Sequence, residues 1–324
     1  MQAIQITQTG GPEVLTLREL PTPTPGPGQA LIKIEASGVN FIDIYLREGR
    51  YPSTLPFVPG QEAAGVVTAI GPDVSTVKVG DRVAWCHAMG TYAQFSLAPV
   101  SLLIAIPDAV TTPQAAAAML QGMTAHYLSQ SAYVIQPGDP VLIHAGAGGV
   151  GLLLIQMAKR LGARVFSTVS TEEKAALARD AGADETILYT REDFVAKVRE
   201  FTGGKGVPVV YDSVGKTTFD GSLACLQRRG LMVLYGGSSG AVPPFDLIQL
   251  STKGSLYITR PTMKDYTSTR AELEQRSGDV LQWVADGSLK LRFEHTYPLA
   301  EAAQAHRDLE ARKTTGKILL IPPQ

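Results

Sequence analysis

The sequence predicts an α/β protein in which a β-rich N-terminal domain precedes a domain with a doubly wound parallel sheet. Three observations lead to this prediction. Short β-like runs separated by Gly and Pro fill residues 1–110, a glycine-rich turn follows an apolar run at 141–151, and apolar runs then alternate with amphipathic ones. Such alternation is typical of a parallel sheet covered by helices on both faces.

The composition suits two packed domains and narrows the partners. The chain has 324 residues, of which 44% are hydrophobic and 18% charged, unlike a disordered chain. With 29 Lys+Arg against 30 Asp+Glu, the net charge of −1 argues against nucleic acid as a partner. Only Cys86 and Cys225 are present, which suits a reducing compartment. Because the polar start lacks a signal-peptide core and the longest apolar stretch is broken by glycines, we expect a cytoplasmic protein without a membrane span.

The first part of the chain predicts strands. The runs AIQIT, LIKIEA, AAGVVTAIG and DRVAW are bounded by turn residues, and Pro21–Gly28 is expected to be an extended loop within the β domain. Thr112 and Pro113 are placed like the start of the Ala-rich helix that follows.

Strand and helix patterns alternate from residue 141 onward. They are VLIHA (141–145), GVGLLLIQMAKRLG (149–162), RVFSTVS (164–170), EEKAALARDAG (172–182), ETILY (185–189), DFVAKVREFTGG (193–204), VPVVYDSVG (207–215), LACLQRRG (223–230) and LMVLYGG (231–237). Two helices, over 273–289 and 300–314, and a short strand near 316–323 are expected at the end of the chain.

Residues 141–151, VLIHAGAGGVG, carry the most informative motif. Gly146, Gly148 and Gly151 have the GxGxxG spacing between a predicted strand and a predicted helix, as a dinucleotide-binding βαβ unit requires. We expect Gly146 to permit the tight turn, Gly148 to let the backbone approach a pyrophosphate, and Gly151 to allow close helix–sheet packing. The helix N-terminus would then bind the phosphates.

The end of the second strand indicates which cofactor is preferred. Val169, Ser170 and Thr171 stand where an NAD site places a carboxylate, and Lys174 follows just beyond, so hydroxyls and an ammonium are available for a 2′-phosphate. We therefore expect NADPH, with a solvated Lys174 as the alternative. Glu172 and Glu173 are close in sequence and are expected to face solvent from the first helical turn.

The sequence contains little that indicates a metal site or a catalytic nucleophile. Cys86 and His87 are adjacent, and the five histidines show no HxxxH spacing; neither a CxxC motif nor a GxSxG elbow occurs. We expect no metal, and chemistry that is carried by the cofactor.

Six segments together resemble one known family. They are GVNFIDIYLREGRYP (38–52), PGQEAAG (59–65), AGAGGVG (145–151), VVYDSVG (209–215), CLQRRGLMVLYGGSSGAV (225–242) and KGSLYITRP (253–261). Over essentially the whole chain the sequence is similar to the zinc-independent quinone oxidoreductases, the zeta-crystallin-like branch of the medium-chain dehydrogenase/reductase superfamily, and to the bacterial NADPH:quinone reductases in particular.

Departures from the zinc-dependent members of that superfamily sharpen the expected chemistry. Those enzymes have Cys after Gly-Val and a Gly-His-Glu sequence, whereas here Asn40 follows Gly38-Val39 and Gln61 precedes Glu62. The four cysteines of the structural zinc lobe are absent as well. Because amides do not replace thiolate and imidazole as zinc ligands, the resemblance implies reduction of a conjugated acceptor rather than oxidation of an alcohol.

The resemblance also implies an organisation. It gives a GroES-like catalytic domain over 1–122, a Rossmann NADPH-binding domain over 123–265 and a segment, 266–324, that returns to the first domain, with an active cleft between the two domains. A homodimer is expected, paired through an exposed sheet edge near residues 254–259.

Site residues follow from the resemblance, residue by residue. Tyr189 would cover the adenine, or alternatively cap the core, and Ser238 and Ser239 could instead be turn residues. Besides Gly146 and Gly151, the cofactor path would include Asn40, Asp43, Tyr127, Gly148, Gly149, Val150, Ser170, Lys174, Tyr189, Ser213, Gly236, Ser238, Ser239 and, as a weaker candidate, Lys317.

The substrate pocket is expected to contain Asn40, Tyr45, Tyr51 and Gln61. Tyr51 could donate a proton, as a Tyr does in related enoyl-thioester reductases, or simply pack beside Pro52. The expected activity is NADPH-dependent quinone reduction. The alternatives are an NADPH-dependent alkenal or enoyl reductase and a non-catalytic NADPH-binding protein that binds RNA. For the second of these, the pair Arg228-Arg229 is interpreted as a solvated turn instead.

Overall fold

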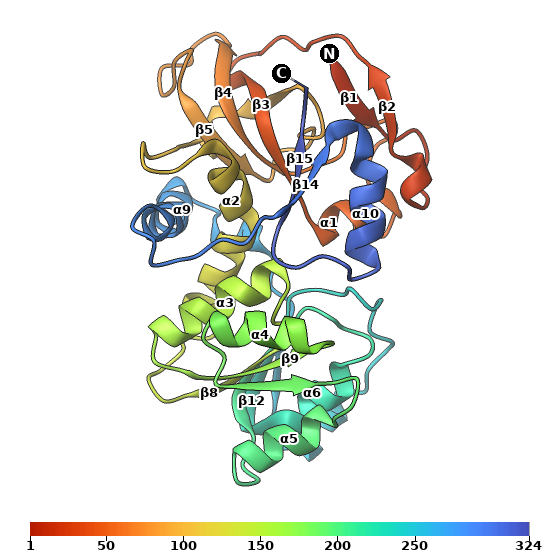
Figure 1. The fold of residues 1–324 in the computed structure, drawn as a ribbon, viewed down its shortest axis with the longest axis vertical. Coiled ribbons are helices and arrows are strands. Elements are labelled where there is room, and N and C mark those ends of the chain that lie inside the picture. Colours follow the sequence, from red (N-terminus) through yellow and green to blue (C-terminus); the bar gives the residue numbers. More distant parts are fainter. Residues whose placement is uncertain (324) are drawn as a thin grey trace. The chain divides into compact units, whose positions relative to one another are not determined.

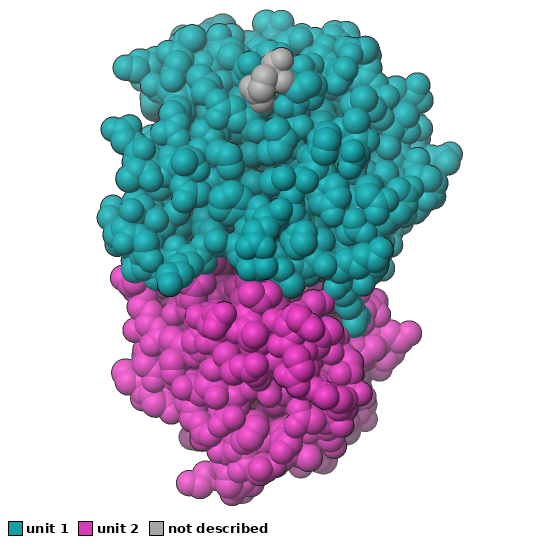
Figure 2. Space-filling view, viewed as in Figure 1, with its two compact units in different colours: residues 1–123, 267–324 teal, residues 124–266 magenta. Residues whose placement is uncertain are grey.

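A computed structural model describes residues 1–323 of the chain and confirms the α/β fold. The chain divides into two compact units, residues 1–123 with 267–324 (unit 1) and residues 124–266 (unit 2), which Figure 2 shows in different colours. Both ends of the chain therefore belong to unit 1. None of the helices between residues 1 and 323 is long and apolar enough to cross a bilayer.

Unit 1 is built on a seven-stranded sheet with the order β14-β15-β3-β4-β5-β7, in which β6 also pairs with β3. Its last strand, β15, comes from the C-terminal end of the chain and pairs antiparallel with β3, Ile318 lying opposite Val39 (Figure 1). A separate hairpin pairs β1 (Gln2–Gln5) with β2 (Thr16–Glu19). The sheet strands are β3 (Gln29–Val39), β4 (Glu62–Ile70), β5 (Arg82–Cys86), β6 (Phe95–Pro99), β7 (Ile104–Ala105), β14 (His295–Pro298) and β15 (Ile318–Ile321).

Short helices flank this sheet. Helix α1 follows β3 directly, and its first turn is closed by Asp43, whose carboxylate accepts the Asn40 N–H at 2.9 Å. The helical segments are η1 (Pro12–Val14), α1 (Phe41–Arg47), η2 (Val100–Leu102), α2 (Thr112–Tyr127), α9 (Arg270–Ala285), η4 (Leu299–Glu301) and α10 (Ala302–Glu310). The division into units falls within α2.

Unit 2 contains a six-stranded, wholly parallel sheet with the order β10-β9-β8-β11-β12-β13. Its strands are β8 (Pro140–Ile143), β9 (Arg164–Val169), β10 (Glu185–Leu188), β11 (Val207–Asp212), β12 (Leu226–Leu234) and β13 (Tyr257–Thr259). Its helices are η3 (Leu128–Ala132), α3 (Gly149–Arg160), α4 (Glu172–Asp180), α5 (Phe194–Phe201), α6 (Phe219–Cys225), α7 (Ile248–Thr252) and α8 (Met263–Tyr266). The strand order reverses between β8 and β11, which is where open α/β sheets bind their ligands.

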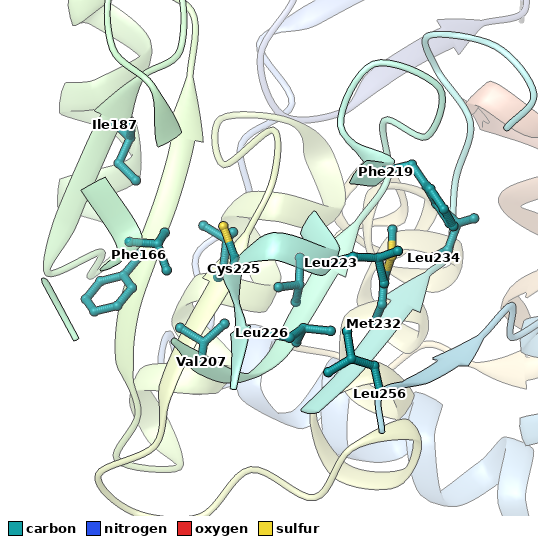
Figure 3. Packing of buried hydrophobic residues seen from close by; sticks show 13 residues of the cluster. Phe166, Ile187, Val207, Phe219, Leu223, Cys225, Leu226, Met232, Leu234 and Leu256 are labelled. Carbon is teal, nitrogen blue, oxygen red and sulfur yellow. The ribbon is translucent and has the colours of Figure 1, made fainter. Parts of the chain in front are cut away.

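The core of unit 2 packs α6 against one face of the parallel sheet. Leu223 and Cys225 of α6 lie among Phe166, Val207 and Met232 of the strands (Figure 3). Burial of an aliphatic or aromatic side chain of this size stabilises a fold by about 1.5–3 kcal/mol. This core fixes the strand ends that carry the predicted site.

One predicted helix is wrong. The pattern LACLQRRG predicts a helix over 223–230, but α6 ends at Cys225 and β12 begins at Leu226. The exposed Arg228 and Arg229 are part of β12, where Arg229 has a φ of 60° and the pairing with β11 is irregular. The pairing partner, Leu226 opposite Val207, overrides the local helical pattern.

Candidate active site

The glycine-rich turn joins β8 to α3 at the reversal of strand order. The left-handed backbone conformation falls on Ala145, with a φ of 55°, and not on Gly146. Gly146 is required for a different reason, because a Cβ there would overlap the side chain of Ser167 on β9. At Gly151 a Cβ would lie 2.9 Å from the Cα of Gly146. Both glycines thus permit close backbone packing rather than an unusual dihedral angle.

The N-terminus of α3 is suited to an anion. Its N-cap residue, Gly148, makes no side-chain hydrogen bond to the helix, and the first turn contains no acidic residue. The first backbone N–H groups of a helix point along its axis and carry a partial positive charge. The chain therefore leaves at this turn a site that fits a phosphate or pyrophosphate.

Helix α4 differs from α3 at the same position. Its N-cap, Thr171, accepts the Lys174 N–H at 3.3 Å, and the first turn carries Glu172 and Glu173. Glu172 is exposed and pairs with Arg191 at 2.5 Å. Hydrogen bonds from its own backbone N–H and from Thr171 lower the pKa of the exposed Glu173. This helix end is therefore already capped and negative.

The ends of β9 and β10 bring the predicted residues Ser170 and Tyr189 close together. The Tyr189 N–H donates to the Val169 carbonyl at 3.2 Å, and the Thr190 hydroxyl donates to the Ser170 carbonyl at 3.1 Å. Tyr189 is 40% exposed, whereas Lys174 is half-buried. The exposure of Tyr189 favours a surface role over the alternative of a core cap.

The loops after β11 and β12 are joined to each other. The Ser238 N–H donates to the Ser213 carbonyl at 3.2 Å, and the Ser239 hydroxyl donates to the Val214 carbonyl at 2.7 Å. A Cβ on Gly236 would lie 2.5 Å from the Ser213 carbonyl oxygen. The predicted residues of these two loops lie together, and Ser238 and Ser239 are both turn residues, since the Gly240 N–H donates to the Gly237 carbonyl at 3.0 Å.

Asp212, which the sequence analysis did not single out, organises these loops. Its carboxylate accepts the N–H groups of Val214 at 2.8 Å and Gly215 at 2.9 Å, and the hydroxyl of Ser222 at 2.7 Å. His144 lies on the other side of Ser222, 3.0 Å from its hydroxyl, and burial lowers the pKa of this imidazole. The sequence does contain a signal for this residue, because an Asp at the end of a strand, followed by Ser-Val-Gly, is typical of a turn.

Tyr127 lies at the C-terminal end of α2. Its ring is 2% exposed and stacks on Tyr266 with the centroids 4.5 Å apart and the planes 11° from parallel. Within unit 2 this pair forms an aromatic stack between α2 and α8.

In unit 1, Asn40, which stands where the zinc-dependent enzymes have a cysteine, belongs to a buried polar cluster with Glu62, Gln121 and Lys317. The Asn40 amide donates to Glu62 Oε2 at 2.9 Å and accepts the Lys317 ammonium at 2.8 Å through Oδ1. Gln121 also donates to Asn40 Oδ1, at 3.3 Å, and Lys317 forms an ion pair with Glu62. Glu62 is completely buried and Lys317 is 2% exposed.

This cluster does not fit a zinc ion. Its polar groups are two amides, one carboxylate and an ammonium that is itself a cation, and amides are poor zinc ligands. Between residues 1 and 323 no group of three His, Cys, Asp or Glu side chains is arranged to hold a metal.

Asp43 connects this cluster to a chain of buried hydrogen bonds. The guanidinium of Arg47 can only donate, so Nδ1 of His306 accepts from it at 3.2 Å. The imidazole then donates from Nε2 to the Tyr92 hydroxyl at 3.1 Å, and Tyr92 donates to Asp43 Oδ2 at 3.1 Å. Burial raises the pKa of Asp43 to about 7, and burial with the nearby Arg47 lowers that of His306 to about 3.

The predicted substrate residues other than Asn40 lie on α1, just after α1 and directly before β4. Tyr45 and Tyr51 meet edge to face, with centroids 5.8 Å apart, and Tyr51 is 40% exposed. Gln61 precedes β4 and accepts the His87 N–H through its backbone carbonyl at 2.9 Å.

Comparison with known families agrees with both units. Residues 26–108 match the alcohol dehydrogenase GroES-like domain and residues 149–275 match the zinc-binding dehydrogenase family. This pairing of domains defines a member of the medium-chain dehydrogenase/reductase superfamily.

Individual relatives narrow the class. A quinone oxidoreductase of Pseudomonas aeruginosa is 45% identical over 98% of this chain and 99% of its own length. The structure of the Escherichia coli quinone oxidoreductase complexed with NADPH superposes with a TM-score of 0.98, at 45% identity over 99% of this chain and 100% of that one. A 2-haloacrylate reductase of a Burkholderia species is 44% identical over 99% of both chains. The chain belongs to the quinone oxidoreductase family.

Proposed function

We propose that the protein reduces quinones with NADPH and without a metal. The observation that carries the proposal is the α3 N-terminus, which has no acidic residue in its first turn and is lined by glycines at the reversal of strand order. A dinucleotide phosphate is the anion that such a turn accommodates in an α/β sheet. The NADPH-complexed relatives support the same assignment.

The chain's residues divide between the parts of the cofactor. Gly146, Gly148, Gly149, Val150 and Gly151 would hold the pyrophosphate. Ser170 and Lys174 would bind the 2′-phosphate and Tyr189 would cover the adenine. The nicotinamide half would meet Asn40, Asp43, Tyr127, Ser213, Gly236, Ser238 and Ser239.

Bound NADPH supplies a hydride or electrons to the acceptor. The contribution of the chain is to bind and orient the two reactants and to stabilise charge on the quinone oxygen. Asn40 offers an amide whose hydrogen bonds are already fixed, and Tyr51 offers a phenol, 40% exposed, as a donor to a quinone carbonyl. Tyr45 packs against Tyr51 and supports its ring. Gln61 completes the proposed substrate residues.

A second candidate is reduction of α,β-unsaturated carbonyl compounds. The 44% identical 2-haloacrylate reductase favours it, because a haloacrylate is also a conjugated acceptor. Both activities need the same cofactor and no metal.

The proposal includes a homodimer in the cytoplasm. Strand β13 is the edge of the parallel sheet, and Tyr257 on it is 60% exposed, so a second copy could continue the sheet. Both cysteines are buried and unpaired, as suits a reducing compartment.

The test is NADPH oxidation with a panel of quinones, 2-alkenals, a 2-haloacrylate and enoyl thioesters. The proposal predicts the highest kcat/KM for a quinone. Higher kcat/KM for the 2-haloacrylate or an alkenal would favour the second candidate. Tight NADPH binding with no turnover on the whole panel would instead support a binding protein.

A further inference from the structure

The ion pair of Lys317 and Glu62 is buried in unit 1 beside Asn40. Lys317 immediately precedes β15, and Glu62 opens β4, so the pair joins two strands on either side of β3. A charge pair removed from water gains little net stability over well-packed apolar residues. Its placement therefore calls for a role other than holding the sheet together.

The backbone of β3 is packed directly against the pair. A Cβ on Gly38 would overlap the Glu62 carboxylate and would lie 2.6 Å from Lys317 Cε and 2.7 Å from its Nζ. Any other residue at position 38 would displace the pair. The second Glu62 oxygen, Oε1, accepts the Leu120 N–H at 2.5 Å, so the carboxylate is held from α2 as well.

The pair gives the Asn40 amide one orientation. An ammonium can only donate and a carboxylate can only accept, so Oδ1 must face Lys317 and Nδ2 must face Glu62. Gln121 must then donate to Asn40 Oδ1 through Nε2, which leaves its own Oε1 as an acceptor. Two amides that could otherwise rotate by half a turn are thus fixed by two charges.

We propose that Lys317 and Glu62 are positioning residues for the reduction, acting through Asn40 and Gln121. The inference rests on the proposed function, in which Asn40 meets the reactants. Donors and acceptors fixed before the reactants arrive need no reorganisation during the reaction. Lys317 then supports Asn40 and is not itself a ligand of the cofactor.

The test replaces both charges at once, with Glu62→Gln/Lys317→Met. Lys317→Met alone would leave a buried, uncompensated carboxylate and could prevent folding, whereas the double variant is neutral. We expect its thermal midpoint to stay close to that of the parent. Its kcat/KM for the quinone should fall about tenfold or more, as when residues that orient a functional side chain by hydrogen bonds are removed from other sites. Lys159→Met/Asp184→Asn, which removes a half-exposed pair in unit 2, is the matched control and should keep its kcat/KM.

A double-mutant cycle separates positioning from a general effect on the fold. In an Asn40→Ala background the Glu62→Gln/Lys317→Met change should have no further effect on kcat/KM, because the group that it positions is gone. Multiplicative losses would overturn the inference. So would a folded double variant with the parent kcat/KM.

A second variant keeps the inference open to refutation if the double variant does not fold. Gln121→Met removes the outer amide, leaves the ion pair intact and should also lower kcat/KM about tenfold or more. A parent-like Gln121→Met enzyme would overturn the inference. If the parent itself fails to reduce quinones with NADPH, the proposed function is overturned and the positioning role with it.

Discussion

At the scale of single residues, Asp43 lies between two buried hydrogen-bonded groups and carries an unusual proton affinity. Burial is the largest cause that raises its pKa from 3.8 to about 7, against the opposing effects of the Asn40 N–H and Lys317. Its Oδ2 accepts two hydrogen bonds, while Oδ1 is buried without a partner. The protonated acid is therefore favoured in the folded chain relative to the unfolded one.

The raised pKa of Asp43 makes the free energy of unfolding depend on pH, because proton binding is linked to folding. Because the folded state binds the proton more tightly, Asp43 contributes most to the free energy of unfolding at low pH, and the contribution is lost as pH rises from about 4 to about 7. Asp43→Asn should remove this dependence. Relative to the parent, the variant should gain about 2 kcal/mol in the free energy of unfolding between about pH 5 and about pH 8. Urea unfolding of both proteins at the two pH values measures it, and an equal difference at both would contradict the assignment.

We propose that the preference for NADPH depends on Lys174. A Glu at this position would repel a 2′-phosphate but not a ribose hydroxyl. Lys174→Glu should therefore raise KM for NADPH by about tenfold or more and change KM for NADH much less. Lys205→Glu, the same charge change at an exposed loop residue, is the control. Equal changes in the two KM values for Lys174→Glu would show that Lys174 is only a solvated helix residue.

Local sequence patterns singled out residues whose proposed contacts lie close to them along the chain. They did not single out residues whose hydrogen-bond partners lie far away in the sequence. The glycine spacing, Ser170 and Lys174 were all visible because one βαβ unit contains them. Glu62, Gln121, Asp212 and His306 were not singled out, because their partners lie on other elements, as for His306 and Arg47. No spacing along the chain encodes such pairs.

At the scale of elements, two substitutions at the N-terminus of α3 can distinguish the effect of a negative charge on NADPH binding from the effect of helix capping on stability. Gly148 is the N-cap with a φ of −76° and a ψ of 169°, a conformation that Asp and Ser also adopt and in which both cap helices well. Gly148→Asp and Gly148→Ser should both leave the thermal midpoint close to that of the parent. Only the Asp variant places a negative charge where the phosphate would bind, so its NADPH affinity should be at least about tenfold below that of the Ser variant.

Calorimetric titration of NADPH into both Gly148 variants measures this difference. A Cβ at position 148 would lie 3.1 Å from the Ala145 carbonyl oxygen, and this steric effect is common to the two variants. Equal affinities would therefore mean that the phosphate does not lie at this helix end.

The helices and strands of unit 2 were largely predictable from the sequence, except where pairing between strands determines the secondary structure. The alternating patterns from 141 to 215 predicted β8 to β11 with α3, α4 and α5 between them, because each strand contains consecutive buried apolar residues and each helix has a buried face. The pattern failed at α6 and β12, where a seven-residue helix runs directly into a strand. Neither segment is long enough for its periodicity to outweigh the tertiary pairing.

At the scale of the whole molecule, a substitution on the edge strand β13 tests the proposed homodimer. Its exposed Tyr257 pairs with Leu231 on one side only, and a lysine on an edge strand discourages pairing with another sheet. Tyr257→Lys should shift the protein from dimer to monomer without changing its thermal midpoint by more than a few degrees. Light scattering after size-exclusion chromatography measures the mass. A monomeric parent, or a variant that remains dimeric, would contradict pairing through this edge.

The central claim is that this chain passes reducing equivalents from NADPH to a quinone without a metal. The most direct measurement is the stoichiometry of the anaerobic reaction of the chelator-treated protein with NADPH and a benzoquinone. We expect one NADPH to be oxidised for each hydroquinone formed, at a rate that the chelator does not change. NADPH that remains intact beside the quinone, or activity that disappears with the chelator and returns with zinc, would contradict it.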